Sequence, residues 1–274
     1  MSATTAMAAR ARPNAAQLLR WSVSDSLVMT RRNLLVWFRV PAYIVFTVVQ
    51  PVIFVLLFRY VFGGAIAVGN QGGYVEYLMP GIIGQTAAFA TFATAIALAQ
   101  EAKQGVIDRL RALPMARSAV LAGRLIADAI RMLVTILVIV GVGYAVGFRF
   151  ENGLLGAIGM VLLAEAFGVT ICCVSAFIGL AIKDEESVQA FGLIWLFPLT
   201  FVSSAFVPIQ SMPGWMQAFA NNQPVTLVIN AMRGLALGGP QFPIFPSLWQ
   251  AVLWLAGILL VFAPLAVRTY RRLS

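Results

Sequence analysis

Six long stretches of almost uninterrupted apolar residues dominate the chain. They lie at about residues 41–62, 77–99, 126–148, 154–182, 188–207 and 248–267. An α-helix needs roughly 20 mostly apolar residues to cross the hydrocarbon core of a bilayer, and each stretch is close to that length. The pattern therefore predicts an all-α membrane protein with six transmembrane helices, in one membrane domain over residues 22–274.

The composition supports a membrane protein and excludes the other broad classes. Hydrophobic residue types make up 61% of the 274 residues and charged types only 11%, against about 45–50% and 25% in an average soluble domain. So few charges cannot cover the surface of a soluble domain of this size. Soluble globular, disordered and fibrous proteins are therefore excluded.

The distribution of basic residues predicts the orientation of the six helices. Fifteen Lys and Arg residues fall in the N-terminal segment, the second and fourth connections and the C-terminus, whereas Arg59, Arg149 and Arg233 fall on the opposite side. Basic residues accumulate on the cytoplasmic side of membrane proteins, so both termini are expected to be cytoplasmic. The first 39 residues contain no apolar run typical of a signal peptide, and residues 1–21 are predicted to be disordered.

Residues 22–39 are typical of a helix that lies on the membrane surface. Ser22 and Asp25 have capping-box spacing, and Trp37 is of the type that lies at a membrane interface. An apolar face and a basic face are both present, formed by Leu27, Leu34, Leu35 and Phe38 and by Arg31, Arg32 and Arg39. A simple basic anchor is the alternative interpretation.

Residues 101–117 form the most informative connection. Val106, Leu110 and Leu113 are spaced so that they share one face of a helix, and Pro114 is expected to end that helix. An apolar stripe flanked by charges suits docking into a groove on a partner protein. The alternative is a solvated loop that only carries basic residues. The connection at 183–187 is a short charged hairpin that is a weaker candidate for the same partner.

A long, proline-rich outer loop spans residues 208–246. Two short helices are predicted there, one starting near Pro213 and one starting at Pro224 after a cap at Asn222 or Gln223. Gly238 is expected to end the second helix. The loop carries few charges, so both helices are expected to dip into the outer leaflet as a re-entrant loop between the fifth and sixth spans.

The chain lacks the residues that most enzyme chemistry requires. It has no histidine, and its two cysteines, Cys172 and Cys173, are adjacent within an apolar stretch. A phosphate-binding loop needs Gly-x-x-x-x-Gly-Lys-Ser/Thr, and neither Lys103 nor Lys183 has that context. We therefore predict no catalytic residue, no metal and no bound cofactor in this chain, and no nucleic-acid partner.

Polar residues inside the spans are candidates for transport. Glu165 lies near the middle of the fourth span, where it could bind a cationic substrate or pair with an arginine of another span; the ion pair is the preferred interpretation. Asp128 is spaced to pair with both Arg124 and Arg131. Packing is the commoner role of such residues. The candidates for a substrate pathway are Gln85, Phe89, Phe92, Glu165, Phe197 and Ser203.

Several motifs together resemble a known family. The residues Glu101, Gly105, Leu110 and Pro114 match the pattern E-x-x-x-G-x-x-x-x-L-x-x-x-P of ABC-2 type transporter permeases. The following Arg117, Gly123 and Arg124 are similar to the daunorubicin-resistance branch of that family. The outer loop adds Phe206-Val207-Pro208, Pro213-Gly214-Trp215, Pro224-Val225-Thr226 and Arg233. The resemblance covers residues 20–270.

The resemblance implies a bacterial cytoplasmic-membrane subunit of an ATP-driven exporter of drugs or lipids. It implies pairing with a second permease copy or a paralogue, and with two ATPase subunits that hold ATP and Mg²⁺. Residues 101–113 would be the helix that couples the permease to the ATPase. The coupling residues are Glu101, Gly105, Asp108, Arg109, Leu110, Arg111, Leu113 and Pro114. A secondary transporter or channel that works without ATP is the alternative, and a purely structural membrane anchor is a third.

Overall fold

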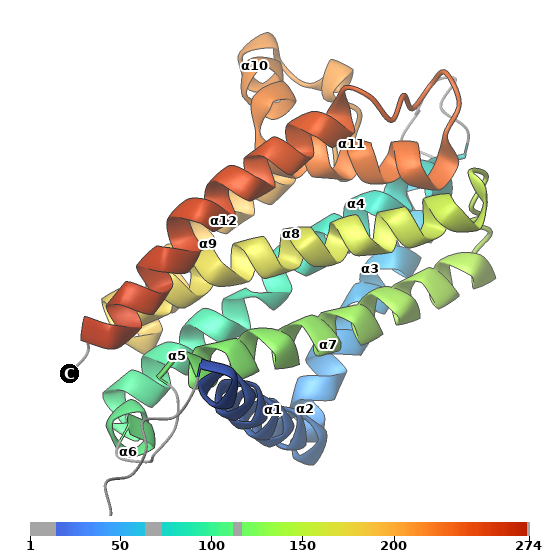
Figure 1. The fold of residues 1–274 in the computed structure, drawn as a ribbon. Helices are drawn as coiled ribbons and strands as arrows, with labels where there is room; N and C mark the ends of the chain where they lie inside the picture. Colours follow the sequence, from blue (N-terminus) through green and yellow to red (C-terminus); the bar gives the residue numbers. More distant parts are fainter. Residues whose placement is uncertain (1–14, 64–72, 112–116, 273–274) are drawn as a thin grey trace, which may run out of the picture.

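The computed structural model describes residues 15–63, 73–111 and 117–272, and within these ranges the chain is helical, with no strand. Four helical segments are long and apolar enough to cross a membrane. They are the pair α4 (Tyr74–Ala90) and α5 (Phe92–Lys103), then α7 (Arg117–Ala145), α8 (Gly153–Ile182) and α12 (Ser247–Arg272). These helices run side by side along one axis of the molecule (Figure 1).

The other two predicted spans are less regular, so the count of six stays a prediction. Residues 41–62 are helical throughout, but α2 (Pro41–Ile44) and α3 (Gln50–Leu57) are each followed by a π-helical turn, at Val45–Val49 and at Phe58–Phe62. The fifth predicted span corresponds to α9 (Glu185–Phe201), which has 17 residues and begins with two glutamates. It ends six residues before the expected boundary.

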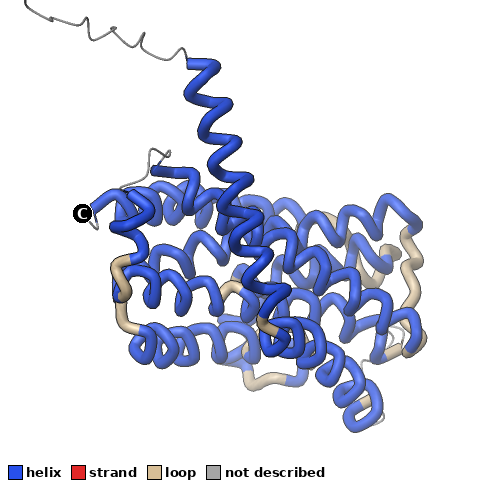
Figure 2. The backbone as a smooth tube through the Cα atoms, turned by 90° about the horizontal axis from the view of Figure 1, so that it is seen from below, coloured by secondary structure: helices blue, strands red, loops and turns tan. Residues whose placement is uncertain are grey.

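The first helix, α1 (Ala15–Arg39), runs across the direction of the long helices (Figure 2). It begins at Ala15, so the expected cap at Ser22 was wrong, and residues 15–21, for which disorder was predicted, belong to this helix. Ser22 lies inside the helix, where its carbonyl accepts a hydrogen bond from the Ser26 hydroxyl at 2.7 Å. Alanine, glutamine and leucine at 15–19 are good helix formers, which explains the extension.

Two different sides of α1 are apolar. Met29 and Trp37 are buried, and α1 packs against α7. Leu27 and Phe38, which belong to the predicted apolar face, are exposed. Trp37, expected at the membrane interface, is covered by protein, whereas the predicted apolar face is left uncovered by this chain.

Helix α8 is the centre of the bundle, with α4, α5, α7, α11 and α12 packed around it. Two close approaches depend on glycine, because a Cβ at either position would overlap a backbone carbonyl of the neighbouring segment. At Gly179 that carbonyl belongs to Ala95 of α5, and at Gly81 it belongs to Ala205, just after α9. The absence of a side chain at these points lets the helices meet backbone to backbone.

The outer loop contains the two predicted short helices, α10 (Gly214–Asn222) and α11 (Pro224–Leu237). Gly238, with a φ of 67°, follows the last residue of α11, as expected. Gln223 directly precedes α11, but its side chain makes no capping hydrogen bond, so the expected side-chain cap was wrong. Most of α11 is buried against α4, α8 and α12.

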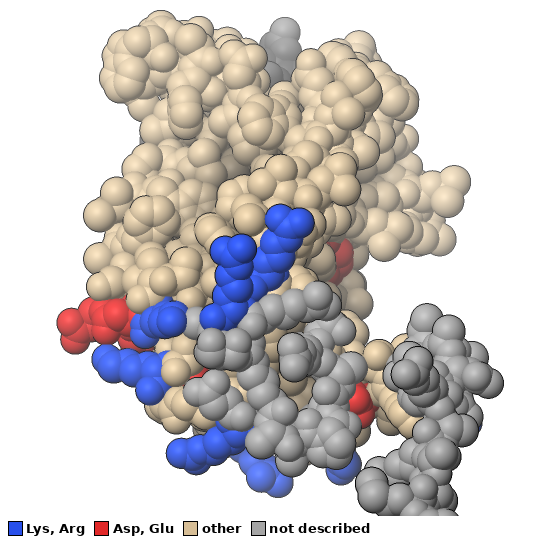
Figure 3. Space-filling model, turned by 60° about the vertical axis from the view of Figure 1, so that its left-hand side comes forward, with Lys and Arg blue, Asp and Glu red and all other residues tan. Residues whose placement is uncertain are grey.

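The two ends of the bundle differ in charge. Helix α6 (Val106–Arg111) and the C-terminus lie at one end, called here the α6 end, and α10 lies at the opposite, α10 end (Figure 1). On the face drawn in Figure 3, Lys and Arg side chains gather toward the lower part of the molecule, and the upper part carries no charged side chain. On this face, an apolar upper part with basic side chains toward the other end suits a protein embedded in a bilayer.

Candidate functional site

The predicted coupling segment is two helices joined by a bend. Helix α5 continues past the expected end of the second span to Lys103, and α6 starts at Val106. Gly105, between them, has a φ of +66°, a left-handed conformation that glycine adopts without strain. The expectation of one continuous helix over 101–113 was therefore wrong. Leu113 and Pro114 lie outside the described residues, as do the side chains of Asp108, Leu110 and Arg111.

Of the three α6 side chains that the structure describes, that of Ile107 is buried and attaches the helix to the bundle. Ile107 belongs to an apolar cluster contributed by α1, α5, α7, α8 and α12: Met29, Leu98, Val120, Leu121, Ala176, Leu180, Ala266 and Tyr270. Val106 is half-buried and Arg109 is exposed. Ile107 is not one of the stripe residues identified in the sequence, so α6 is fixed to the bundle by a residue outside that stripe.

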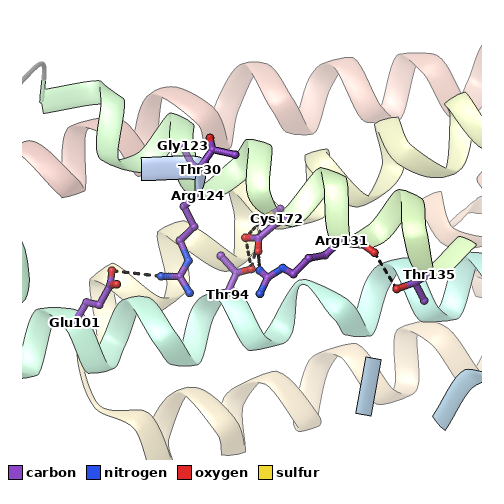
Figure 4. A network of polar contacts seen from close by, with 9 residues as sticks. Thr30, Thr94, Glu101, Gly123, Arg124, Arg131, Thr135 and Cys172 are labelled. Atoms are coloured by element: carbon purple, nitrogen blue, oxygen red, sulfur yellow. Dashed lines mark hydrogen bonds and ion pairs between the residues drawn. The ribbon is translucent and has the colours of Figure 1, made fainter. Parts of the chain in front are cut away.

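Glu101, the first residue of the family motif, joins three helices. Its carboxylate lies 3.7 Å from the Arg32 guanidinium of α1 and 3.3 Å from that of Arg124 of α7. Nearby, the Thr30 hydroxyl donates to the Gly123 carbonyl at 3.1 Å (Figure 4). The pairing of Arg124 with Asp128, expected from their spacing, is thus wrong: Arg124 reaches the neighbouring helix α5 instead.

A second polar cluster lies deeper in the bundle, around the buried carboxylate of Asp128 on α7. Asp128 forms the expected ion pair with Arg131. It also accepts a hydrogen bond from the Thr94 hydroxyl of α5 at 2.7 Å, and the Cys172 thiol of α8 lies 3.5 Å away. Figure 4 shows Thr94, Arg131 and Cys172 converging from three helices. The Glu101 and Asp128 clusters together tie α1, α5, α7 and α8 to the segment that leads into α6.

The short loop between α8 and α9 lies beside the end of α5. The Lys103 ammonium is 3.2 Å from the Asp184 carboxylate. Asp184 also caps α9 by accepting from the Ser187 N–H at 3.0 Å. The hydrogen bonds from Ser187, followed by the nearby Lys103, lower the pKa of Asp184. The charged loop at 183–187 and the coupling segment therefore form one surface at the α6 end.

A row of stacked phenylalanines connects α3 with α4 and α9. Phe197 and Phe201 of α9 stack at 4.2 Å between ring centroids, and Phe197 meets Phe89 of α4 edge to face at 6.5 Å. The row continues from Phe201 to Phe206 and then to the residues at the end of the first apolar segment. Its members are Phe54, Phe58, Phe62, Phe89, Phe197, Phe201 and Phe206. Phe197 is 48% exposed and Phe201 38%, so the row presents ring surfaces on the outside of a single chain.

The other pathway candidates do not belong to this row. Gln85 is buried in α4, and Ser203 is buried in the turn after α9, where its hydroxyl accepts from the Ala205 N–H at 3.1 Å. Phe92 lies against Gly192 of α9, close to the row, because a Cβ at Gly192 would overlap its ring. Of the six predicted residues, the structure brings Phe89 and Phe197 into ring contact, and Phe92 packs against the same helix, α9.

Glu165 lies on α8 without the arginine partner that the sequence analysis preferred. One of its carboxylate oxygens is buried and has no hydrogen-bond partner, and none of the ion pairs found in the described part of the chain involves Glu165. Its neighbours at helical spacing, Ile158 and Leu162, are exposed. The ion-pair interpretation was thus wrong, and a half-buried carboxyl group lies beside the exposed stripe of α8.

Arg233 is a residue that the sequence identified as an outer basic residue and as part of the family motif in the outer loop, without assigning it a role. It is 1% exposed. Its guanidinium donates to the Tyr77 carbonyl at 2.9 Å, to the Ser204 hydroxyl at 3.0 Å and to the Asn230 side chain at 2.9 Å, and it lies 3.6 Å from the centre of the Tyr77 ring. It also donates to the Ser204 and Ala205 carbonyls. The sequence feature that could have identified this role is a lone arginine in an otherwise apolar helix.

Replacing Arg233 with methionine is expected to lower the free energy of unfolding by about 3 kcal/mol, because several buried carbonyls lose their donors. Thermal unfolding of the detergent-solubilised protein would measure this loss. Arg149→Met is the control, because Arg149 is exposed and its contacts are local: the carbonyls of Tyr144 and Phe148 and the ring of Tyr144. Equal stabilities of the two variants would contradict the role of Arg233 as the residue that holds α11 against α4.

The helices and the polar clusters define a multi-pass membrane protein with a short helix attached at its charged end. Comparison with known proteins gives the family. Residues 25–237 match the ABC-2 type transporter family. Because this match covers most of the chain, the chain belongs to that family, and it is a membrane permease.

The similar proteins include permeases named for drug resistance. The chain is 35% identical to the daunorubicin resistance ABC transporter permease protein DrrB1 of Streptomyces coeruleorubidus, over 91% of this chain and 87% of that protein. It is 34% identical to the probable doxorubicin resistance ABC transporter permease protein DrrC of Mycobacterium tuberculosis, over 96% and 94%. It is 23% identical to the inner membrane transport permease YadH of Escherichia coli, over 78% and 85%.

Proposed function

We propose that this chain is the membrane-spanning subunit of an ATP-driven exporter for hydrophobic or amphipathic compounds, with ATP bound and hydrolysed by a separate partner. Two ATPase subunits and a second permease, identical or different, would complete the transporter. The α6 end faces the cytoplasm in this proposal, and the helices at 41–62 and 185–201 provide the first and fifth of six crossings of the bacterial cytoplasmic membrane. Basic residues at the α6 end support this orientation.

The observation that carries the proposal is the way α6 is attached. Ile107 fixes it in the apolar cluster at the α6 end, and the Glu101 cluster fixes the preceding turn of α5 to α1 and α7. Because α1, α5 and α7 are tied together here, a push on α6 reaches the second and third spans as well as the surface helix. An attached helix that carries an apolar stripe suits transmission of force from an ATPase.

The phenylalanine row supports an amphipathic and aromatic substrate. Phe197 and Phe201 expose ring faces on the surface of a single chain, where a flat molecule can stack. A second permease placed against α9 would enclose this surface and turn it into a pathway between the two copies. The names of the similar permeases point to the same substrate class, since daunorubicin and doxorubicin appear in them.

The experiment is transport into inside-out membrane vesicles that contain this chain and its ATPase, with daunorubicin as the probe. We expect quenching of daunorubicin fluorescence that requires ATP and survives collapse of the ion gradients by an ionophore. The matched control lacks only this chain. Uptake that persists without ATP and stops with the ionophore would contradict the proposal and favour the alternative, a secondary transporter.

Replacing Glu165 with glutamine is expected to reduce transport of cationic substrates about tenfold, a change of about 1.4 kcal/mol. A carboxylate inside the membrane attracts a protonated amine, and an uncharged amide does not. The measurement compares daunorubicin with an uncharged hydrophobic compound in the same vesicles, with Glu151→Gln as a control at an exposed position of the α7–α8 connection. Equal loss for both compounds would contradict a role in binding the amine.

A further inference from the structure

A groove along α12 has no role in the function proposed above. It is lined by Asn221 and Asn222 of α10, Leu227 of α11 and seven residues of α12: Gln250, Leu253, Trp254, Gly257, Ile258, Val261 and Phe262. The cavity volume is about 590 Å³, within the usual range for sites that hold small molecules. The α12 residues recur three or four positions apart, so they form one face of that helix.

Most of this face of α12 does not pack against the rest of the chain: Leu253, Trp254 and Val261 are exposed. Only at its edge does Phe262 meet Phe177 of α8, with ring centroids 5.8 Å apart, next to the buried Ala251 and Leu255. Only 17% of the most apolar window of α12 is buried, compared with 61% for α8. In a membrane this face must be covered by lipid or by another protein.

The polarity of the groove changes along its length. Its α10 end carries three side-chain amides, from Asn221, Asn222 and Gln250, and the rest of its wall is apolar. None of the lining residues is charged. From Gln250 to Phe262 the helix rises by about 18 Å, close to the ~15 Å depth of one leaflet of the hydrocarbon core. The groove is therefore polar at one end and apolar for about the depth of a leaflet.

We propose that this groove binds one acyl chain of a glycerophospholipid from the leaflet at the α10 end. The amide N–H groups of Asn221, Asn222 and Gln250 donate to the ester carbonyls of the lipid, and the chain lies along Leu253, Ile258 and Val261. Uncharged amides match ester carbonyls, and they leave the charged part of the headgroup in water. The site recognises the ester region and the chain, and it does not depend on which substrate the transporter moves.

Gly257 provides the test, because it lies in the middle of the groove wall. A Cβ added there would meet no atom within 4 Å, so leucine fits without disturbing the helix packing and fills the space of the acyl chain. Gly141 of α7 is the matched control. It also has no atom within 4 Å of an added Cβ, and it too is an exposed glycine of a membrane-spanning helix, outside the groove.

The experiment uses the full chain with its ATPase in vesicles that contain phosphatidylethanolamine with a diazirine at the end of one acyl chain. After illumination, mass spectrometry of the digested protein locates the label. We expect labelling within residues 253–262, lowered about tenfold by Gly257→Leu, a loss of about 1.4 kcal/mol in affinity. Gly141→Leu is expected to retain the wild-type labelling.

Three results would overturn the proposal. The first is equal labelling of Gly257→Leu and the wild type. The second is labelling that daunorubicin removes and excess unlabelled phosphatidylethanolamine does not, which would make the groove a substrate site. The third is efficient crosslinking of cysteines placed at 253 in two copies, which would make it a protein interface. Transport in the same vesicles is measured separately, so failure of the exporter proposal leaves this result interpretable.

Discussion

Replacing Leu110 with aspartate is expected to lower ATP-driven transport by about a hundredfold, equal to about 3 kcal/mol. Leu110 belongs to the apolar stripe predicted for the coupling segment, together with Val106 and Leu113. A carboxylate on that stripe must lose its hydration to enter an apolar groove on the ATPase, which strongly disfavours docking. Drug transport and ATPase activity of the reconstituted complex measure the effect.

The matched control for this prediction is Leu110→Met, which keeps an apolar side chain of similar volume and is expected to retain transport. Thermal unfolding of both variants tests whether the helical bundle stays intact. The assignment of residues 101–113 to coupling is contradicted if Leu110→Asp transports at the wild-type rate. It is also contradicted if the variant loses transport only because the bundle unfolds at a lower temperature.

Replacing Asp128 with alanine is expected to destabilise the protein by about 3–5 kcal/mol, the usual effect of removing one partner from a buried ion pair. The change deprives Arg131 of a carboxylate and Thr94 of an acceptor. It therefore weakens the contact between α5 and α7 next to the Glu101 cluster. The midpoint of thermal or chemical unfolding in detergent, followed by circular dichroism, measures the loss.

The double variant Asp128→Ala with Arg131→Leu is the informative control. Apolar replacement of a whole buried ion pair is often neutral, so the second change is expected to restore most of the stability. Transport separates a structural role from a coupling role, because a cluster that only stabilises would leave the rescued protein active. A single variant as stable as the wild type would show that Asp128 does not hold α5 and α7 together.

The hydrophobic pattern predicted helix location well and helix ends less well. The fourth span, expected at 154–182, is α8 at Gly153–Ile182. The fifth ends early, at Phe201, because the following turn bonds to α4 and α11 through Tyr77, Thr226 and Arg233. Such long-range contacts leave no periodic trace in the sequence. The bend at Gly105 was also not predicted, because its left-handed φ depends on the position in which α6 packs.

Pairing between helices was the part of the site that the sequence could not predict. Local spacing favours Arg124 with Asp128, yet Arg124 contacts Glu101 because α5 lies beside α7. The burial of Ile107 and the bonds of Arg233 depend in the same way on neighbours that are distant in the sequence. The residue types in the spans identified polar candidates. The role of each candidate could be assigned only once the arrangement of the helices was known.

The dependence of this permease on a separate ATPase can be tested by purifying the chain from its host in mild detergent, identifying the bound proteins and assaying ATPase activity. We expect an ABC ATPase subunit to purify with the wild type in a fixed ratio, and both the subunit and the activity to be lost with Leu110→Asp. A chain that purifies without an ATPase and moves solute under an ion gradient alone would contradict it.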